Sequence, residues 1–180
     1  LITAVGALLC SAPDRINEVL RLPVQCEYHA LDTEGNPLFG IRWWPSKGAD
    51  PYIKWVVGSM STVAQEAIEK VARLTQEARR IALWYEQNPT KLYLPPDHED
   101  LRTEELVCPA DLVPLLGLSS PKAARTWLYD AEVPVHMRNG RVFARFADVE
   151  RAVVETLPTG FPVFDNEVDT PFSESLFVVP

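Results

Sequence analysis

Apolar residues follow two helical patterns at the start of the chain. Residues 2–9 are nearly all apolar or small and predict a core helix, and Pro13 suits the first turn of a second helix over residues 14–22. In this second helix the apolar side chains recur near a period of 3.6, so one face is expected to be buried. The residues expected to face the core are Ile16, Val19, Leu20 and Leu22, and those expected to point away are Arg15, Glu18 and Arg21.

The pattern then changes to short segments separated by turn residues. Residues 26–31, 38–44 and 52–57 predict three strands of an antiparallel sheet, with turns at 32–36 and 46–51. Thr62 and Gln65 next match a capping box, which predicts one long helix ending near Gln87, because Asn88 precedes a proline. The apolar positions expected on its buried face are Val63, Ala67, Val71, Leu74, Ala78 and Ile81.

The second half of the chain predicts a smaller module. Residues 109–116 form an expected helix closed by Gly117, and Ser119 or Ser120 caps a second helix that starts at Pro121. Asn139-Gly140 between alternating segments predicts a β-hairpin, and a last helix is expected over residues 147–156.

These patterns predict an α+β fold in four parts. Residues 1–88 hold the helices and the three-stranded sheet, and residues 89–106, which are polar and contain two prolines, are expected to be a linker. Residues 107–157 are the small module, and residues 158–180 are an acidic tail.

Composition narrows the class of protein. The chain has 180 residues, of which 47% are apolar, enough for a core in one ordinary domain or two small ones. Its three cysteines lack metal-ligand spacing, so we expect reduced thiols in a cytoplasmic protein and no metal site. The apolar start is too short to cross a membrane, and since the sequence opens at Leu1 without Met we expect a piece of a longer polypeptide.

Charge argues against a protein that coats nucleic acid without specificity. The net charge is -8, whereas such proteins neutralise phosphates with Lys and Arg. The acidic residues lie mainly in the middle of the chain and in the tail, while the module at residues 108–157 has equal numbers of basic and acidic side chains. A localised basic surface on that module therefore remains compatible with the composition.

The first half resembles the catalytic domain of tyrosine recombinases, the phage-type integrases. The resemblance rests on the run Arg15-Ile16-Asn17-Glu18-Val19-Leu20, followed by three strands and a long helix. It implies that Arg15 is an active-site arginine that clamps a DNA phosphate, and that Lys47 in the second turn is the general acid, with Lys54 as second choice. The implied activity is strand exchange through a phosphotyrosine in DNA integration or recombination, without a cofactor.

The sequence also departs from that family. None of the three histidines begins a His-x-x-Arg segment, and no tyrosine follows Tyr129. We therefore predict that these 180 residues alone do not cleave DNA, and that the missing groups belong to another part of the parent enzyme. The family acts through assemblies on DNA, so other recombinase subunits are expected partners besides double-stranded DNA.

The small module resembles the winged helix-turn-helix of excisionase-like and MerR-like proteins, and it looks like an insertion within the recombinase domain. The match includes Leu115-Leu116-Gly117-Leu118-Ser119, Val133-Pro134-Val135 and residues 141–148. By this resemblance the start of the second helix approaches the major groove and the hairpin contacts phosphates or the minor groove. The residues expected to contact DNA are Lys122, Arg125, Arg138, Arg141 and Arg145, together with Lys54.

Two other functions fit the same sequence. A non-enzymatic DNA-binding transcription regulator would depend on Lys122 and Arg141, with Arg15 and Lys47 incidental. A protein interaction module would show no DNA affinity, since helix-turn-helix shapes also serve as docking units.

Overall fold

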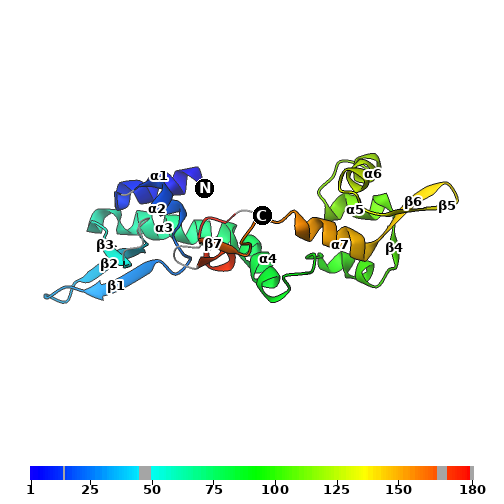
Figure 1. The fold of residues 1–180 in the computed structure, drawn as a ribbon. Coiled ribbons are helices and arrows are strands. Elements are labelled where there is room, and N and C mark those ends of the chain that lie inside the picture. The colour runs from blue at the N-terminus through cyan, green and yellow to red at the C-terminus, as the bar shows by residue number, and fades with distance from the viewer. Residues whose placement is uncertain (14, 45–49, 166–169, 179–180) are drawn as a thin grey trace. The chain divides into compact units, whose positions relative to one another are not determined.

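The protein has a mixed α+β structure made of two compact units. The computed structural model describes residues 1–13, 15–44, 50–165 and 170–178 (Figure 1). Residues 1–86 and 160–180 form the first unit, and residues 87–159 form the second. The second unit is therefore an insertion in the sequence of the first, and each unit has its own hydrophobic core.

The first unit begins with helices α1 (Ile2–Ser11) and α2 (Ile16–Leu20). Both were predicted, but α2 is shorter and its buried face is only partly as expected. Val19 and Leu22 lie in the core, whereas Ile16 is 56% exposed and the side chain of Glu18 is buried. A five-residue helix is too short to bury a whole face, so Leu22, beyond the end of the helix, makes the second core contact.

The predicted three-stranded antiparallel sheet is confirmed. Its strands β1 (Glu27–Leu31), β2 (Pro37–Trp43) and β3 (Tyr52–Trp55) lie in the order β1-β2-β3. The turn between β1 and β2 is closed by Asp32, whose carboxylate accepts the backbone N–H groups of Glu34 and Asn36, both at 2.8 Å. Alternation along β2 puts one side of the strand into the core. The β2 residues on that side are Phe39, Ile41 and Trp43.

The predicted long helix is two helices, α3 (Gly58–Leu74) and α4 (Gln76–Gln87), which are separated at Thr75. The Thr75 hydroxyl lies 2.9 Å from the Val71 carbonyl oxygen and 3.0 Å from that of Leu176, so the break is also where the end of the chain docks. The expected buried face is confirmed in part, because Ala67, Val71 and Ala78 are buried as predicted. Val63 and Leu74 are exposed, and the buried positions of α3 are Ala64, Ala67, Ile68 and Val71.

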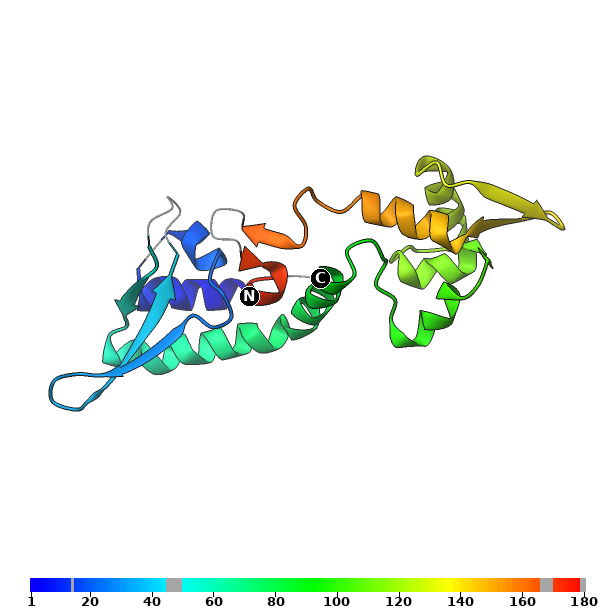
Figure 2. The same cartoon turned by 60° about the horizontal axis from the view of Figure 1, so that its bottom comes forward.

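The segment predicted to be a separate acidic tail belongs to the first unit. It contains β7 (Val163–Asp165), β8 (Thr170–Pro171) and the 3-10 turn η2 (Phe172–Glu174), after which Leu176 and Val178 are buried. Figure 2 shows this orange and red segment beside the helices of the unit. The N–H of Leu176 donates to the Leu22 carbonyl at 2.8 Å, so the apolar end of the segment gains both core contacts and backbone hydrogen bonds.

The second unit combines a small sheet with four helical segments. The 3-10 helix η1 (Pro96–Arg102) is followed by β4 (Leu106–Val107), α5 (Pro109–Leu115) and α6 (Pro121–Asp130). Then come β5 (Val135–Arg138), β6 (Arg141–Arg145) and α7 (Phe146–Glu155), and the sheet order is β4-β6-β5. Both helices around Gly117, the hairpin and the last helix were predicted.

The segment expected as a linker is instead part of this second core. Leu92, Leu94 and Leu101 are buried together with the apolar residues of α6 and β6. Burial of these leucines outweighs the polar and proline-rich composition of residues 89–106, on which the expectation rested.

Candidate nucleic-acid interface

Helix α6 presents a polar face that begins at a well-formed N-terminus. The hydroxyl oxygen of Ser120 accepts the N–H of Ala123 at 3.2 Å, and Pro121 occupies the first turn. Ala124 and Leu128 fix the opposite face in the core. This orientation leaves Lys122 and Arg125 exposed.

The turn before α6 is equally determined by local sequence. Helix α5 starts at Pro109, and the Asp111 carboxylate accepts the N–H of Cys108 at 2.8 Å. After α5 the chain turns at Gly117, whose φ of +61° is a conformation that glycine adopts without strain. The two helices therefore meet through a short turn, as the sequence predicts.

The hairpin β5–β6 carries its basic residues on one face. Asn139 and Gly140 at its tip both have positive φ, which matches the type I′ turn expected from Asn-Gly. The register pairs Arg138 with Arg141 and His136 with Phe143, and Val142 and Ala144 point into the core. Alternation along the strands puts Arg138, Arg141, His136, Phe143 and Arg145 on the outward face.

A depression of about 400 Å³ joins the start of α6 to the hairpin. Lys122 and Arg125 line it from α6, and Arg141 lines it from β6. None of the described residues that line it is acidic, and the rest of the lining is small or apolar: Cys108, Pro109, Ala110, Pro121, Gly140 and Val142. Three of the predicted DNA contacts thus converge on one concave surface, hereafter the basic depression.

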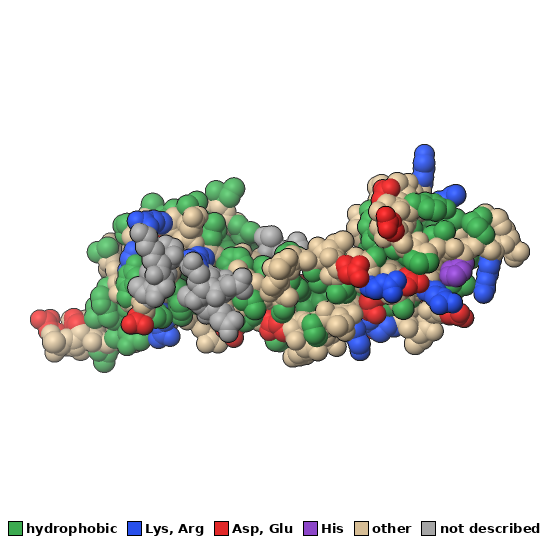
Figure 3. Space-filling view, in the orientation of Figure 1, with side chains coloured by type: hydrophobic (Ala, Val, Ile, Leu, Met, Phe, Trp, Pro, Cys, Tyr) green, Lys and Arg blue, Asp and Glu red, His purple; other side chains and the backbone are tan. Residues whose placement is uncertain are grey.

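Arg145 lies in a different environment from the other basic residues. It lines a second depression of about 510 Å³, which is also lined by two cations and three glutamates: Lys91, Arg102, Glu104, Glu105 and Glu150. Unlike the depression beside α6, this one is lined by as many acidic as basic side chains. Figure 3 shows Lys and Arg side chains over α6, the hairpin and α7, with acidic side chains interspersed mainly away from the hairpin tip.

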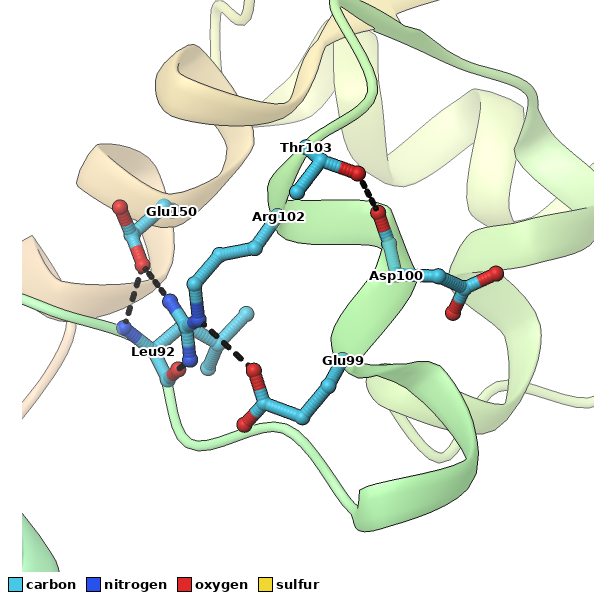
Figure 4. A network of polar contacts seen from close by, with 6 residues as sticks. All are labelled: Leu92, Glu99, Asp100, Arg102, Thr103 and Glu150. Carbon is cyan, nitrogen blue, oxygen red and sulfur yellow. Dashed lines mark hydrogen bonds and ion pairs between the residues drawn. The ribbon is translucent and has the colours of Figure 1, made fainter.

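The carboxylate beside Arg145 belongs to a structural network. Arg102 donates to Glu150 at 2.8 Å and to the Leu92 carbonyl at 2.7 Å, and Glu99 accepts from its Nε at 3.1 Å (Figure 4). The same Glu150 oxygen accepts the N–H of Leu92 at 2.9 Å. These bonds fix residues 92–102 against α7 and leave Arg102 engaged within the unit.

The candidate residues of the first unit are only partly brought together. Arg15 is exposed at the N-cap of α2, and Lys47 lies outside the described residues. The Lys54 ammonium donates to the Pro13 carbonyl at 3.0 Å and lies 5.3 Å from the centre of the Trp43 ring. Strand β3 therefore holds its lysine against the segment that leads to Arg15.

Sequence reasoning missed two aromatic residues beside the basic ones. Tyr129 lies under the guanidinium of Arg125, with 5.7 Å from the guanidinium carbon to the ring centre, and Phe143 shares the outward face with Arg141. The i, i+4 spacing of Arg125 and Tyr129 and the alternation of β6 were both available in the sequence as signals.

Other kinds of site find no support in the described ranges. There, no group of three or more His, Cys, Asp and Glu side chains is arranged to hold a metal ion. Of the helices described, none has the length and apolar character needed to cross a bilayer. No protein-family model, no curated protein and no solved structure matches the chain.

Proposed function

We propose that the protein binds double-stranded DNA through its second unit. The observation that carries the proposal is the convergence of Lys122, Arg125 and Arg141 on the basic depression. The order of helix, turn, helix and hairpin resembles a winged helix-turn-helix, in which α6 enters the major groove and the hairpin acts as the wing. Affinity then comes from neutralised phosphates, and the start of α6 reads base edges.

The negative net charge is compatible with this proposal because the charges are segregated. Most acidic residues of the second unit lie in residues 97–105 and in α7, and the other three, Asp111, Asp130 and Glu132, are outside the lining of the basic depression. Such a surface binds DNA in one orientation, while the acidic remainder of the chain opposes non-specific coating.

The test measures the affinity of the full chain for a random duplex by fluorescence anisotropy between 50 and about 200 mM salt, the range in which phosphate contacts dominate. We expect Lys122→Ala/Arg125→Ala to weaken binding and to lower the salt slope by about one to two, since each lost phosphate contact contributes about 0.9. The matched control is Lys70→Ala/Arg80→Ala, which removes the same charge from surface ion pairs of the first unit. Equal effects of the two double variants, or no binding by the wild type, would refute the proposal.

We also propose that the first unit is part of a recombinase-like strand-transfer centre. The observation that favours this second function is the hydrogen bond from Lys54 to the carbonyl of Pro13, two residues before Arg15 in the sequence. In this centre Arg15 contacts a DNA phosphate, and Lys54 or Lys47 supplies the proton donor.

Binding of a duplex tests the second function, because the chain lacks a His-x-x-Arg segment and strand cleavage is not its expected readout. Arg15→Ala is expected to weaken binding in the background of intact Lys122 and Arg125. Arg73→Ala, an exposed arginine in the last turn of α3, is the control and is expected to have no effect. Indistinguishable affinities for the two variants would remove Arg15 from the DNA contacts.

A further inference from the structure

The tip of the β5–β6 hairpin places two like charges directly opposite each other. Arg138 and Arg141 are Cα partners in the register, on either side of the Asn139-Gly140 turn. Directly opposite residues of an antiparallel pair have Cβ atoms about 5 Å apart and share a face, so the two guanidinium groups repel each other. Both arginines are exposed, and among the described residues no carboxylate forms an ion pair with either.

The rest of this face offers no compensation. The next pair inward is His136 with Phe143, and neither side chain carries a negative charge. The acidic side chains of the second depression lie around Arg145, at the other end of β6 from the tip. A hairpin selected for stability alone favours opposite charges at such a pair.

We infer that Arg138 and Arg141 are a clasp for a single phosphate of the DNA backbone, and that the free protein bears a stability cost for it. This inference rests on the proposed DNA-binding function and names the part of DNA that the hairpin recognises. Two guanidinium groups present several N–H donors to one phosphate, and the bound anion replaces their repulsion with two attractive contacts. Arg141 also lines the basic depression, so the clasp extends that surface to the hairpin tip.

The clasp predicts opposite effects of one substitution on stability and on DNA binding. Arg138→Glu turns the repulsive pair into an attractive one, so the hairpin is stabilised in the absence of DNA. Hydrogen exchange of the β6 amides of Arg141 and Phe143, which alternation of the pairs directs toward β5, is expected to slow by roughly two- to fivefold in the full chain. The same variant is expected to lose affinity for a random duplex and to lower the salt slope by at least about one.

Arg138→Lys is the matched control, because it keeps the charge but not the planar fork. It is expected to leave the exchange rates unchanged and the salt slope near that of the wild type, with weaker binding. Inorganic phosphate at constant ionic strength separates the two sources of the anion. If inorganic phosphate slows β6 exchange in the wild type but not in Arg138→Glu, a free phosphate is enough to bind the clasp. If only the duplex slows this exchange, the clasp needs the DNA backbone.

Failure of the inference differs from failure of the proposed function. If the duplex binds and depends on Lys122 and Arg125, but Arg138→Glu leaves the salt slope unchanged, the clasp is refuted while DNA binding stands. Unchanged or faster β6 exchange in Arg138→Glu refutes the stability cost. Absence of any duplex binding by the wild type overturns both.

Discussion

Leu176 offers a direct test of the finding that the end of the chain completes the first unit. Its side chain is 0% exposed, and its backbone joins Leu22 and Thr75 through hydrogen bonds. Leu176→Ala removes three buried carbon groups, each worth about 0.8 kcal/mol of transfer free energy, or about 2.4 kcal/mol together. The cavity left behind adds to this, so we expect a loss of about 2–5 kcal/mol in the free energy of unfolding of the first unit.

Native-state hydrogen exchange with mass spectrometry measures both units in one sample. The loss expected for Leu176→Ala corresponds to exchange at least about 30-fold faster in peptides from β2, while peptides from α6 are unchanged. Leu31→Ala, which truncates the same side chain at a position that is 69% exposed, is the control and should cost well under 1 kcal/mol. Equal exchange of β2 in the two variants, or equal acceleration in α6, would refute the assignment of residues 160–180 to the first unit.

Three further predictions concern stability. A Cβ at Gly40 would lie 2.6 Å from the side chain of Ile53, so Gly40→Ala should lower the thermal midpoint of unfolding. Gly6→Ala in α1, where the Cβ meets open space, should raise this midpoint slightly, and the opposite order would contradict the packing described. Burial, with the nearby negative charge of a glutamate, raises the pKa of the Cys26 thiol from 9.0 to about 12. At a pH between these two values the folded protein keeps the thiol proton, whereas the unfolded chain loses it. The stability of the first unit, measured by urea unfolding, should therefore fall between about pH 9 and 12, and an equal fall in Cys26→Ala would exclude this cause. Arg102→Met should cost the second unit about 1–3 kcal/mol in urea unfolding because Glu150 loses its cation, and a cost near zero would show that the network contributes no net stability.

The sequence predicted local elements better than the assignment of segments to cores. The capped helix at Pro121 and the hairpin at Asn139-Gly140 depend on turn chemistry within a few residues, and both are present. Thr75 could not be identified as a break, because its hydroxyl contacts Leu176 from a segment about a hundred residues away in the sequence. The same long-range packing explains why residues 89–106 and 158–180 were expected to lie outside the cores.

The candidate site was predicted residue by residue but not as a surface. The resemblance to a winged helix-turn-helix singled out Lys122, Arg125 and Arg141, and the structure adds that they are exposed and converge on one depression. Period-two alternation alone could not separate Arg145 from Arg141, because both lie on the outward face of β6. The charged residues that line the depression with Arg145 come from residues 91–105 and from α7, which only the fold brings together.

We propose that duplex DNA binds at the start of α6 and at the hairpin tip. The most direct measurement is an NMR titration of the isotopically labelled full chain with a random duplex, which follows each backbone amide. The largest shifts are expected for residues 120–125 and 138–142, with β1 of the first unit unaffected. Shifts that leave these two segments unchanged, or no shifts at all, would contradict the claim.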